Sequence, residues 1–155
     1  MPSFKGTYEH TVDQKGRLSI PTRIRDILNK EYGGGELYIT VLEDCIEVYP
    51  LQEWNKKEDK LRLLPSHNKQ VLMFLRAQYS RAFDCSMDRS GRILIPPHMR
   101  KKCGINGSVA IVGVMDHFEI WPIDKWIEKE KEIEGNMTAL MEKIAELELD
   151  VLSDR

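Results

Sequence analysis

The sequence contains no long hydrophobic run and only a few scattered cysteines. No apolar stretch approaches the roughly 20 residues of a membrane-spanning helix, and the first residues lack the apolar region of a signal peptide. Cys45, Cys85 and Cys103 form no CxxC pair, which argues against a disulfide framework and against a cysteine zinc site. These absences predict a cytoplasmic protein with reduced thiols and no membrane partner.

Motifs of catalysis and cofactor binding are also missing. No GxSxG, phosphate loop or GxGxxG occurs, and the run at 33–35 lacks the Lys-Ser/Thr of a nucleotide loop. The histidines show no HxH or HExxH spacing, which favours ordinary surface or core roles over metal ligation; they are His10, His67, His98 and His117. We therefore expect no enzymatic activity, no catalytic residue, no cofactor and no metal site.

What the sequence does contain is an internal duplication. Residues 13–25 match residues 88–100 at an offset of 75, with Asp, Gly, Arg, Ile, Pro and Arg at identical positions. Residues 46–54 match residues 118–126 at an offset of 72, because the first copy carries an extra glycine run. A repeated unit buries its apolar face against a copy of itself. We expect a fused pseudo-dimer that presents the same surface chemistry twice.

The net charge of −2 is unevenly distributed. Residues 128–155 hold nine acids against four bases (net −5), and residues 1–127 hold nineteen bases against sixteen acids (net +3). Within this part, residues 14–25 contain four bases and no acid, and residues 89–102 contain five bases and no acid. Local charge density governs how a polyanion meets a protein surface. Both basic clusters lie in the repeated segment and indicate a nucleic-acid partner.

Local patterns predict the same order of elements in each copy. Short strands over 10–13 and 17–20 are expected to pair as a hairpin, with Gly16 at a positive φ in a three-residue loop. A helix from Pro21 to the glycine run and strands over 37–42 and 45–49 follow.

Further helices are expected over 51–63, from an N-cap at Ser66 to Tyr79, and in the tail. The tail shows heptad spacing of apolar residues, at Ile133, Met137, Leu140, Ile144, Leu147 and Val151. This stripe fits either a helix packed on its own core or a short contact between chains.

An acid and an arginine flank each predicted loop: Asp13 with Arg17, and Asp88 with Arg92. A carboxylate can fix a guanidinium and leave its outer N–H groups free to meet a guanine edge or a phosphate. The alternative is a plain salt bridge at a hairpin tip, worth only about 0 to 1 kcal/mol. The duplication and the neighbouring bases favour a binding surface.

The frame Asp-x-x-x-Arg followed by apolar-x-Ile-Pro resembles the AbrB-like swapped-hairpin DNA-binding fold. With residues 6–10, residues 64–66 and the Tyr-Pro and Trp-Pro strand ends, residues 1 to about 127 are similar to the MraZ family of bacterial transcriptional regulators. The resemblance implies an α+β fold: a double-split β-barrel formed by two tandem AbrB-like repeats, with flanking and C-terminal helices.

The resemblance also implies a domain organisation and a function. It places repeat 1 at 1–62, a connecting helix at 63–80, repeat 2 at 81–127 and an acidic amphipathic helical tail at 128–155. It implies a nucleoid-associated repressor of the division and cell-wall gene cluster. Such a repressor binds repeated G-rich promoter boxes in double-stranded DNA as a homo-oligomeric ring.

Carried onto this chain, the resemblance makes the bases of both repeats the DNA-binding candidates. These are Lys15, Arg17, Arg23, Arg25, Arg89, Arg92 and Arg100. Asp13 and Asp88 are the acids expected to orient the arginines, and Gly16 and Gly91 are the turn glycines. Copy two departs from copy one, with Ser90 in place of Lys15, Leu94 in place of Ser19, and Pro97-His98 in place of Thr22-Arg23. Which half contacts DNA therefore stays open.

Two other functions fit the same fold. A protein-interaction module, antitoxin-like, would use the acidic tail to wrap a basic partner. A ring scaffold without a nucleic-acid role would bind no duplex.

Overall fold

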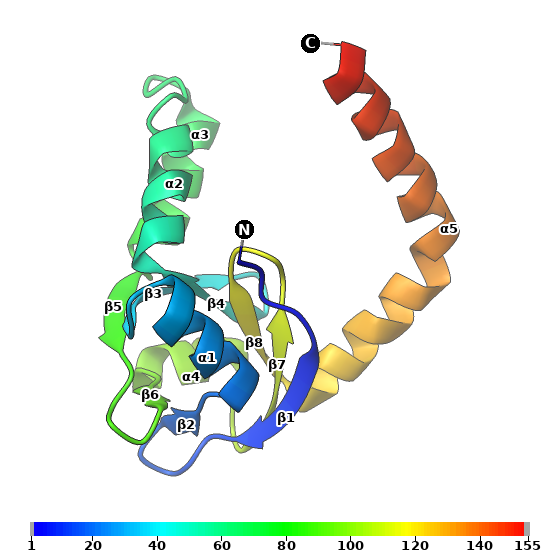
Figure 1. The fold of residues 1–155 in the computed structure, drawn as a ribbon. Coiled ribbons are helices and arrows are strands. Elements are labelled where there is room, and N and C mark those ends of the chain that lie inside the picture. Colours follow the sequence, from blue (N-terminus) through cyan, green and yellow to red (C-terminus); the bar gives the residue numbers. More distant parts are fainter. Residues whose placement is uncertain (1, 154–155) are drawn as a thin grey trace. The chain divides into compact units, whose positions relative to one another are not determined.

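The computed structural model describes residues 2–153, and these residues adopt an α+β structure (Figure 1). The chain divides into two units, Met1–Ile123 and Asp124–Arg155. The strands are β1 (Thr7–Thr11), β2 (Arg17–Ser19), β3 (Glu36–Leu42), β4 (Cys45–Pro50), β5 (Phe83–Ser86), β6 (Arg92–Leu94), β7 (Ser108–Gly113) and β8 (Phe118–Pro122). The helices are α1 (Thr22–Glu31), α2 (Leu51–Leu61), α3 (Lys69–Tyr79), α4 (Pro97–Cys103) and α5 (Ile123–Ser153).

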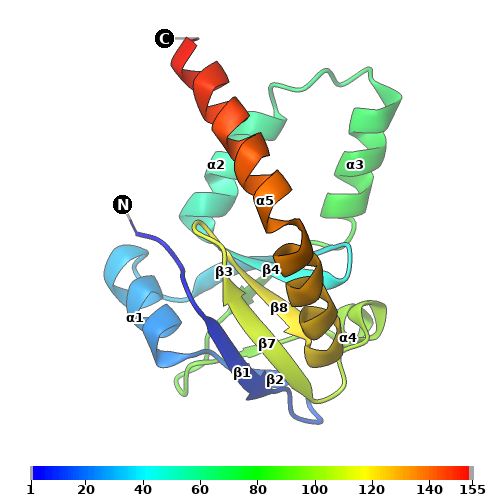
Figure 2. The same ribbon diagram turned by 90° about the vertical axis from the view of Figure 1, so that its right-hand side faces the viewer.

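The strand order of the first unit is that of two interleaved repeats. Six antiparallel strands form one sheet in the order β1-β7-β8-β4-β3-β5, of which Figure 2 labels all but β5, and β2 pairs with β6 in a separate ribbon. Since β5, β7 and β8 correspond to β1, β3 and β4 in the repeat alignment, the order reads the same from both ends. The sheet is open, with β1 and β5 as its edges.

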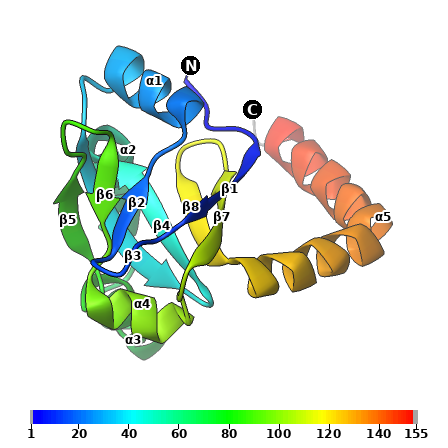
Figure 3. The same ribbon diagram turned by 90° about the horizontal axis from the view of Figure 1, so that it is seen from below.

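A pseudo-twofold axis follows from this order. Glu47 of β4 lies opposite its repeat counterpart Glu119 of β8. In the ribbon, Leu18 of β2 lies opposite its counterpart Ile93 of β6. The axis therefore passes through the centre of the sheet and the centre of the ribbon, and α1 and α4 lie on opposite sides of the ribbon (Figure 3).

The predicted hairpin pairing is wrong. The strands on either side of the first turn do not pair with each other: β1 pairs with β7, and β2 pairs with β6. The turn itself is closed by a hydrogen bond of 3.0 Å from the backbone N–H of Asp13 to the carbonyl of Arg17. Because β2 of one repeat pairs with β6 of the other, Leu18 and Ile93 are buried, at 0% and 1% exposed. Each repeat therefore buries its apolar face against the other repeat.

The helices follow the predicted start and stop signals in most places. Gly104, with φ 73°, ends α4 in the left-handed conformation. The connecting helix α3 begins later than predicted, because Asn68 rather than Ser66 is its N-cap and accepts hydrogen bonds from the N–H groups of Gln70 and Val71. Strand β5 occupies the repeat position of β1, which agrees with the prediction of the same order of elements in each copy.

Helix α5 runs for 31 residues and continues through Gly135 and Asn136. Its apolar stripe is half-buried at Ile133 and exposed from Met137 (45%) to Val151 (59%). Between residues 2 and 153, no helix combines the length and the apolar character that crossing a membrane requires.

Candidate nucleic-acid interface

The first DxxxR turn is held by one carboxylate. One oxygen of Asp13, Oδ1, accepts hydrogen bonds from the backbone N–H groups of Lys15 (3.0 Å) and Arg17 (2.9 Å). The other, Oδ2, accepts from Nε of Arg17 at 2.7 Å. These bonds fix the turn and the start of the arginine side chain together. Among residues 2–153, the hydrogen bonds of this guanidinium involve Nε and leave both Nη groups available.

The second turn has the same geometry. Asp88 accepts from the N–H groups of Ser90 (2.8 Å) and Arg92 (3.0 Å) through Oδ1, and from Nε of Arg92 (3.0 Å) through Oδ2. Hydrogen bonds from the arginine backbone N–H, aided by the arginine side chain and its charge, lower the pKa of both Asp13 and Asp88. Both acids therefore stay ionised at neutral pH and keep each arginine oriented.

The β2–β6 ribbon brings the two arginines onto one face. Arg17 is the register partner of Leu94, and Arg92 is the register partner of Ser19. Because side chains alternate along a strand, these four side chains share the face opposite to that of the buried Leu18–Ile93 pair. Diagonal neighbours in an antiparallel pair lie about 7–8 Å apart between Cα atoms. Arg17 and Arg92 thus form one paired-arginine surface to which both repeats contribute.

Two further predicted residues support the opposite turn. A side-chain carbon at Gly16 would lie 3.0 Å from Nε of Arg100, and one at Gly91 would overlap the side chain of Arg25. The Nε of Arg100 also donates to the carbonyl of Ile95 at 3.1 Å. Each of these arginines therefore packs beneath the turn glycine of the other repeat. The sequence alignment matched Arg25 with Arg100 but could not show this crossing.

The remaining predicted bases lie on the surface. Lys15, Arg23 and Arg89 are exposed. Lys15 and Arg89 sit within the two turns, and Arg23 belongs to the first turn of α1. Lys15 and Arg89 thus add positive charge in the same turns that hold Arg17 and Arg92.

Alanine at two glycines with positive φ, Gly33 and Gly16, should separate the cost of backbone strain from the cost of steric crowding. At Gly33 the φ is +72° with nothing within 4 Å, whereas at Gly16 the φ is +87° and a Cβ would lie 2.7 Å from the carbonyl oxygen of Ile95. We expect Gly33→Ala to lower the free energy of unfolding by about 1 kcal/mol, and Gly16→Ala by about 2–4 kcal/mol. Urea unfolding measures both variants. Equal losses would contradict the close approach at Gly16.

The fold and this surface define a class of protein: two interleaved α+β repeats that share a ribbon bearing paired arginines. A family model described as "MraZ protein, putative antitoxin-like" matches residues 3–77 and again residues 79–147. The two matches confirm the repeat.

Relatives in several bacteria carry the name "Transcriptional regulator MraZ". The relative from Moorella thermoacetica is 40% identical over 147 residues, covering 94% of this chain and 99% of that protein. The relative from Desulfosudis oleivorans is 38% identical over 134 residues (86% and 90%), and that from Heliobacterium modesticaldum is 34% identical over 148 residues (94% and 99%). The chain belongs to the MraZ family of transcriptional regulators, as the resemblance predicted. The names describe regulators rather than enzymes.

Among solved structures, the solution structure of PHS018 from Pyrococcus horikoshii is 18% identical and covers 76% of this chain and 96% of that chain. Its TM-score of 0.36 does not establish a common fold.

Proposed function

We propose that this chain is a sequence-specific DNA-binding repressor of the bacterial division and cell-wall gene cluster. It binds double-stranded DNA at repeated promoter boxes, as a homo-oligomeric ring, in the cytoplasm and on the nucleoid. The observation that carries the proposal is the placement of Arg17 and Arg92 on one face of the β2–β6 ribbon, each held by an ionised acid.

The geometry suits base recognition. A two-stranded β-ribbon fits the major groove of B-form DNA, and the Nη groups of a fixed arginine match the O6 and N7 acceptors of guanine. Arg17 and Arg92 are therefore the base-reading residues. Lys15, Arg23 and Arg89 bind phosphates and set the orientation, and Arg25 and Arg100 combine positive charge with support of the turns.

The proposed architecture is a double-split barrel of two repeats, 1–62 and 81–127, with 63–80 as the connection and 128–155 as the tail. It is supported by the contacts of β2 with β1 and of β6 with β5, which set the ribbon against both edges of the open sheet. In a ring, several copies of the paired-arginine surface meet several DNA boxes. Once one subunit is bound, the other subunits are held at a high effective concentration near the remaining boxes, so the overall affinity exceeds that of a single contact.

The test is binding to the promoter upstream of the chain's own operon, compared with a shuffled duplex, by fluorescence anisotropy. We expect tighter binding to the promoter. If the three bases per subunit assigned to phosphates make their contacts, the affinity should fall roughly fortyfold between about 50 and 200 mM salt. Equal, weak binding to both duplexes would overturn the proposal.

A specific observation favours the antitoxin-like alternative: α5 is acidic and its apolar stripe is exposed. A variant that ends at residue 127 keeps the first unit whole. The repressor function predicts that this variant still prefers the promoter to the shuffled duplex in the same assay, with equal or weaker avidity. The alternative predicts no promoter preference in either form.

A further inference from the structure

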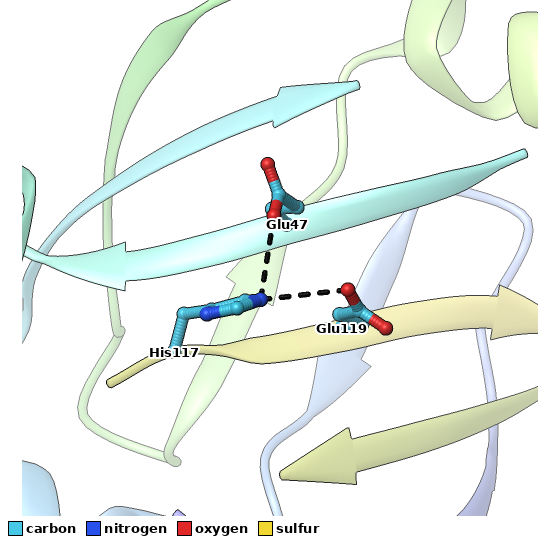
Figure 4. Close-up of side chains that lie close together, drawn as sticks. All are labelled: Glu47, His117 and Glu119. Carbon is cyan, nitrogen blue, oxygen red and sulfur yellow. Dashed lines mark hydrogen bonds and ion pairs between the residues drawn. The ribbon is translucent and has the colours of Figure 1, made fainter. Parts of the chain in front are cut away.

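Three ionisable side chains meet where the pseudo-twofold axis crosses the sheet: Glu47, His117 and Glu119 (Figure 4). The imidazole Nε2 of His117 lies 3.3 Å from Oε2 of Glu47 and 3.4 Å from Oε2 of Glu119. The three side chains are 10%, 6% and 17% exposed, in the order His117, Glu47, Glu119. The two acids are repeat counterparts on β4 and β8, whereas the repeat counterpart of His117 is Cys45.

Neighbouring groups fix the orientation of all three. Asp116 Oδ1 lies 2.7 Å from Nδ1 of His117. When Nδ1–H donates to this carboxylate, the Nε2 lone pair faces the two glutamates. Tyr49 donates its hydroxyl to Oε2 of Glu47 at 3.1 Å, and Trp121 donates Nε1–H to Oε1 of Glu119 at 3.0 Å. Each acid is thus held by the aromatic residue two positions along its own strand.

Two carboxylates directly opposite each other on adjacent strands repel, so a positive group between them is stabilising. Lys57 offers its ammonium 3.8 Å from Oε1 of Glu47, the oxygen that does not face His117. A proton on His117 is a second candidate. Burial lowers the pKa of His117, but hydrogen bonds with Glu119 and Asp116 and the charges of Glu47 and Asp116 outweigh burial and raise it.

A metal ion is the third candidate, and the geometry fits it. Ligand atoms about 2.1 Å from a tetrahedral ion lie about 3.4 Å apart, close to the two separations between His117 and the glutamates, and all three ligand atoms lie within 4.8 Å of one another. Metal-bound histidines almost always donate their other ring N–H to a carboxylate, a backbone carbonyl or a water, which fixes the tautomer, and Asp116 is placed to accept this bond from His117. One nitrogen and two carboxylate oxygens suit divalent transition metals such as Zn²⁺, Co²⁺ and Mn²⁺.

We propose that Glu47, His117 and Glu119 form a binding site for a divalent transition-metal ion, with Asp116 as the positioning residue for His117. The ligands come from both repeats, so a bound ion joins β4 to β8 at their shared axis. Histidine spacing could not predict this site, because the ligands become neighbours only when the two central strands pair.

The experiment titrates metal-free, full-length protein with Zn²⁺ by calorimetry and with Co²⁺ by absorption. We expect one ion per chain, a Co²⁺ d–d spectrum without a sulfur charge-transfer band, and a rise in unfolding temperature with Zn²⁺. Glu119→Gln and His117→Ala should each abolish saturable binding. Asp116→Asn should weaken it roughly tenfold to a hundredfold. The control is His67→Ala, which removes an exposed histidine between α2 and α3 and should leave the dissociation constant unchanged.

Several outcomes would overturn the site: no saturable binding by the wild type, binding by His117→Ala as tight as wild type, or a thiolate band. The first of these would leave protonated His117 as the group that bridges the two acids. If His117→Ala does not fold by circular dichroism, His117→Gln replaces it. The Co²⁺ spectrum of the wild type decides the nature of the ligands in either case.

Discussion

Arg17→Ala and Arg92→Ala are each expected to weaken binding to the promoter duplex about tenfold to a hundredfold, corresponding to about 1–3 kcal/mol for a lost bidentate base contact. The two losses should be similar, because both arginines share one face of the β2–β6 ribbon and both are held by an acid through Nε. The measurement is fluorescence anisotropy at fixed salt with the promoter and a shuffled duplex. Preference for the promoter should fall along with affinity.

The control is Arg62→Ala, which also removes one positive charge but lies at the C-terminal end of α2. It should change binding only slightly and equally for both duplexes, since it tests net charge alone. Thermal unfolding of all three variants should match the wild type closely, because exposed ion pairs contribute about 0 to 1 kcal/mol. A large loss with Arg17→Ala and none with Arg92→Ala would contradict the shared surface and assign DNA reading to the first repeat.

The sequence predicts those parts of the site that depend on residues close together in the chain, and it does not predict those that depend on which strands pair. The turn geometry of Asp13 and Arg17 is local, since a carboxylate at this spacing can reach the backbone and side chain of the same turn. The boundaries of α1 and α4 are local as well, because proline precedes them and glycine follows. Such features could be predicted, and the duplication added that they occur twice.

Strand partners are not local. An alternating pattern specifies which face of β2 is buried but not which strand lies beside it, so the strands around the first turn were assigned to a hairpin. The repeat contained the missing information, because a unit that buries its face against a copy of itself can exchange strands with that copy. The packing of Arg100 against Gly16 and the meeting of Glu47 with Glu119 both depend on that exchange.

Phe4→Ala is expected to cause the largest loss of stability. Phe4 is 1% exposed, stacks on Tyr32 at 5.9 Å between ring centroids and contacts Phe118 edge-on at 5.6 Å. Truncating a buried phenylalanine costs about 3–5 kcal/mol through lost burial and the cavity left behind. The cavity cannot close easily, because the backbone of Phe4 is bonded to that of Met115 in both directions, at 2.7 and 3.0 Å.

Urea unfolding and calorimetry measure the effect, and a loss of this size corresponds to a fall in unfolding temperature of roughly 10–20 °C. Leu63→Ala is the control, since Leu63 is 85% exposed and such substitutions stay within about 0.5 kcal/mol. If Phe4→Ala behaved like Leu63→Ala, the first residues would not be part of the core. The expected loss instead makes the N-terminal segment a structural part of the unit, because Phe118 begins β8, the strand that pairs with β4 at the pseudo-twofold axis.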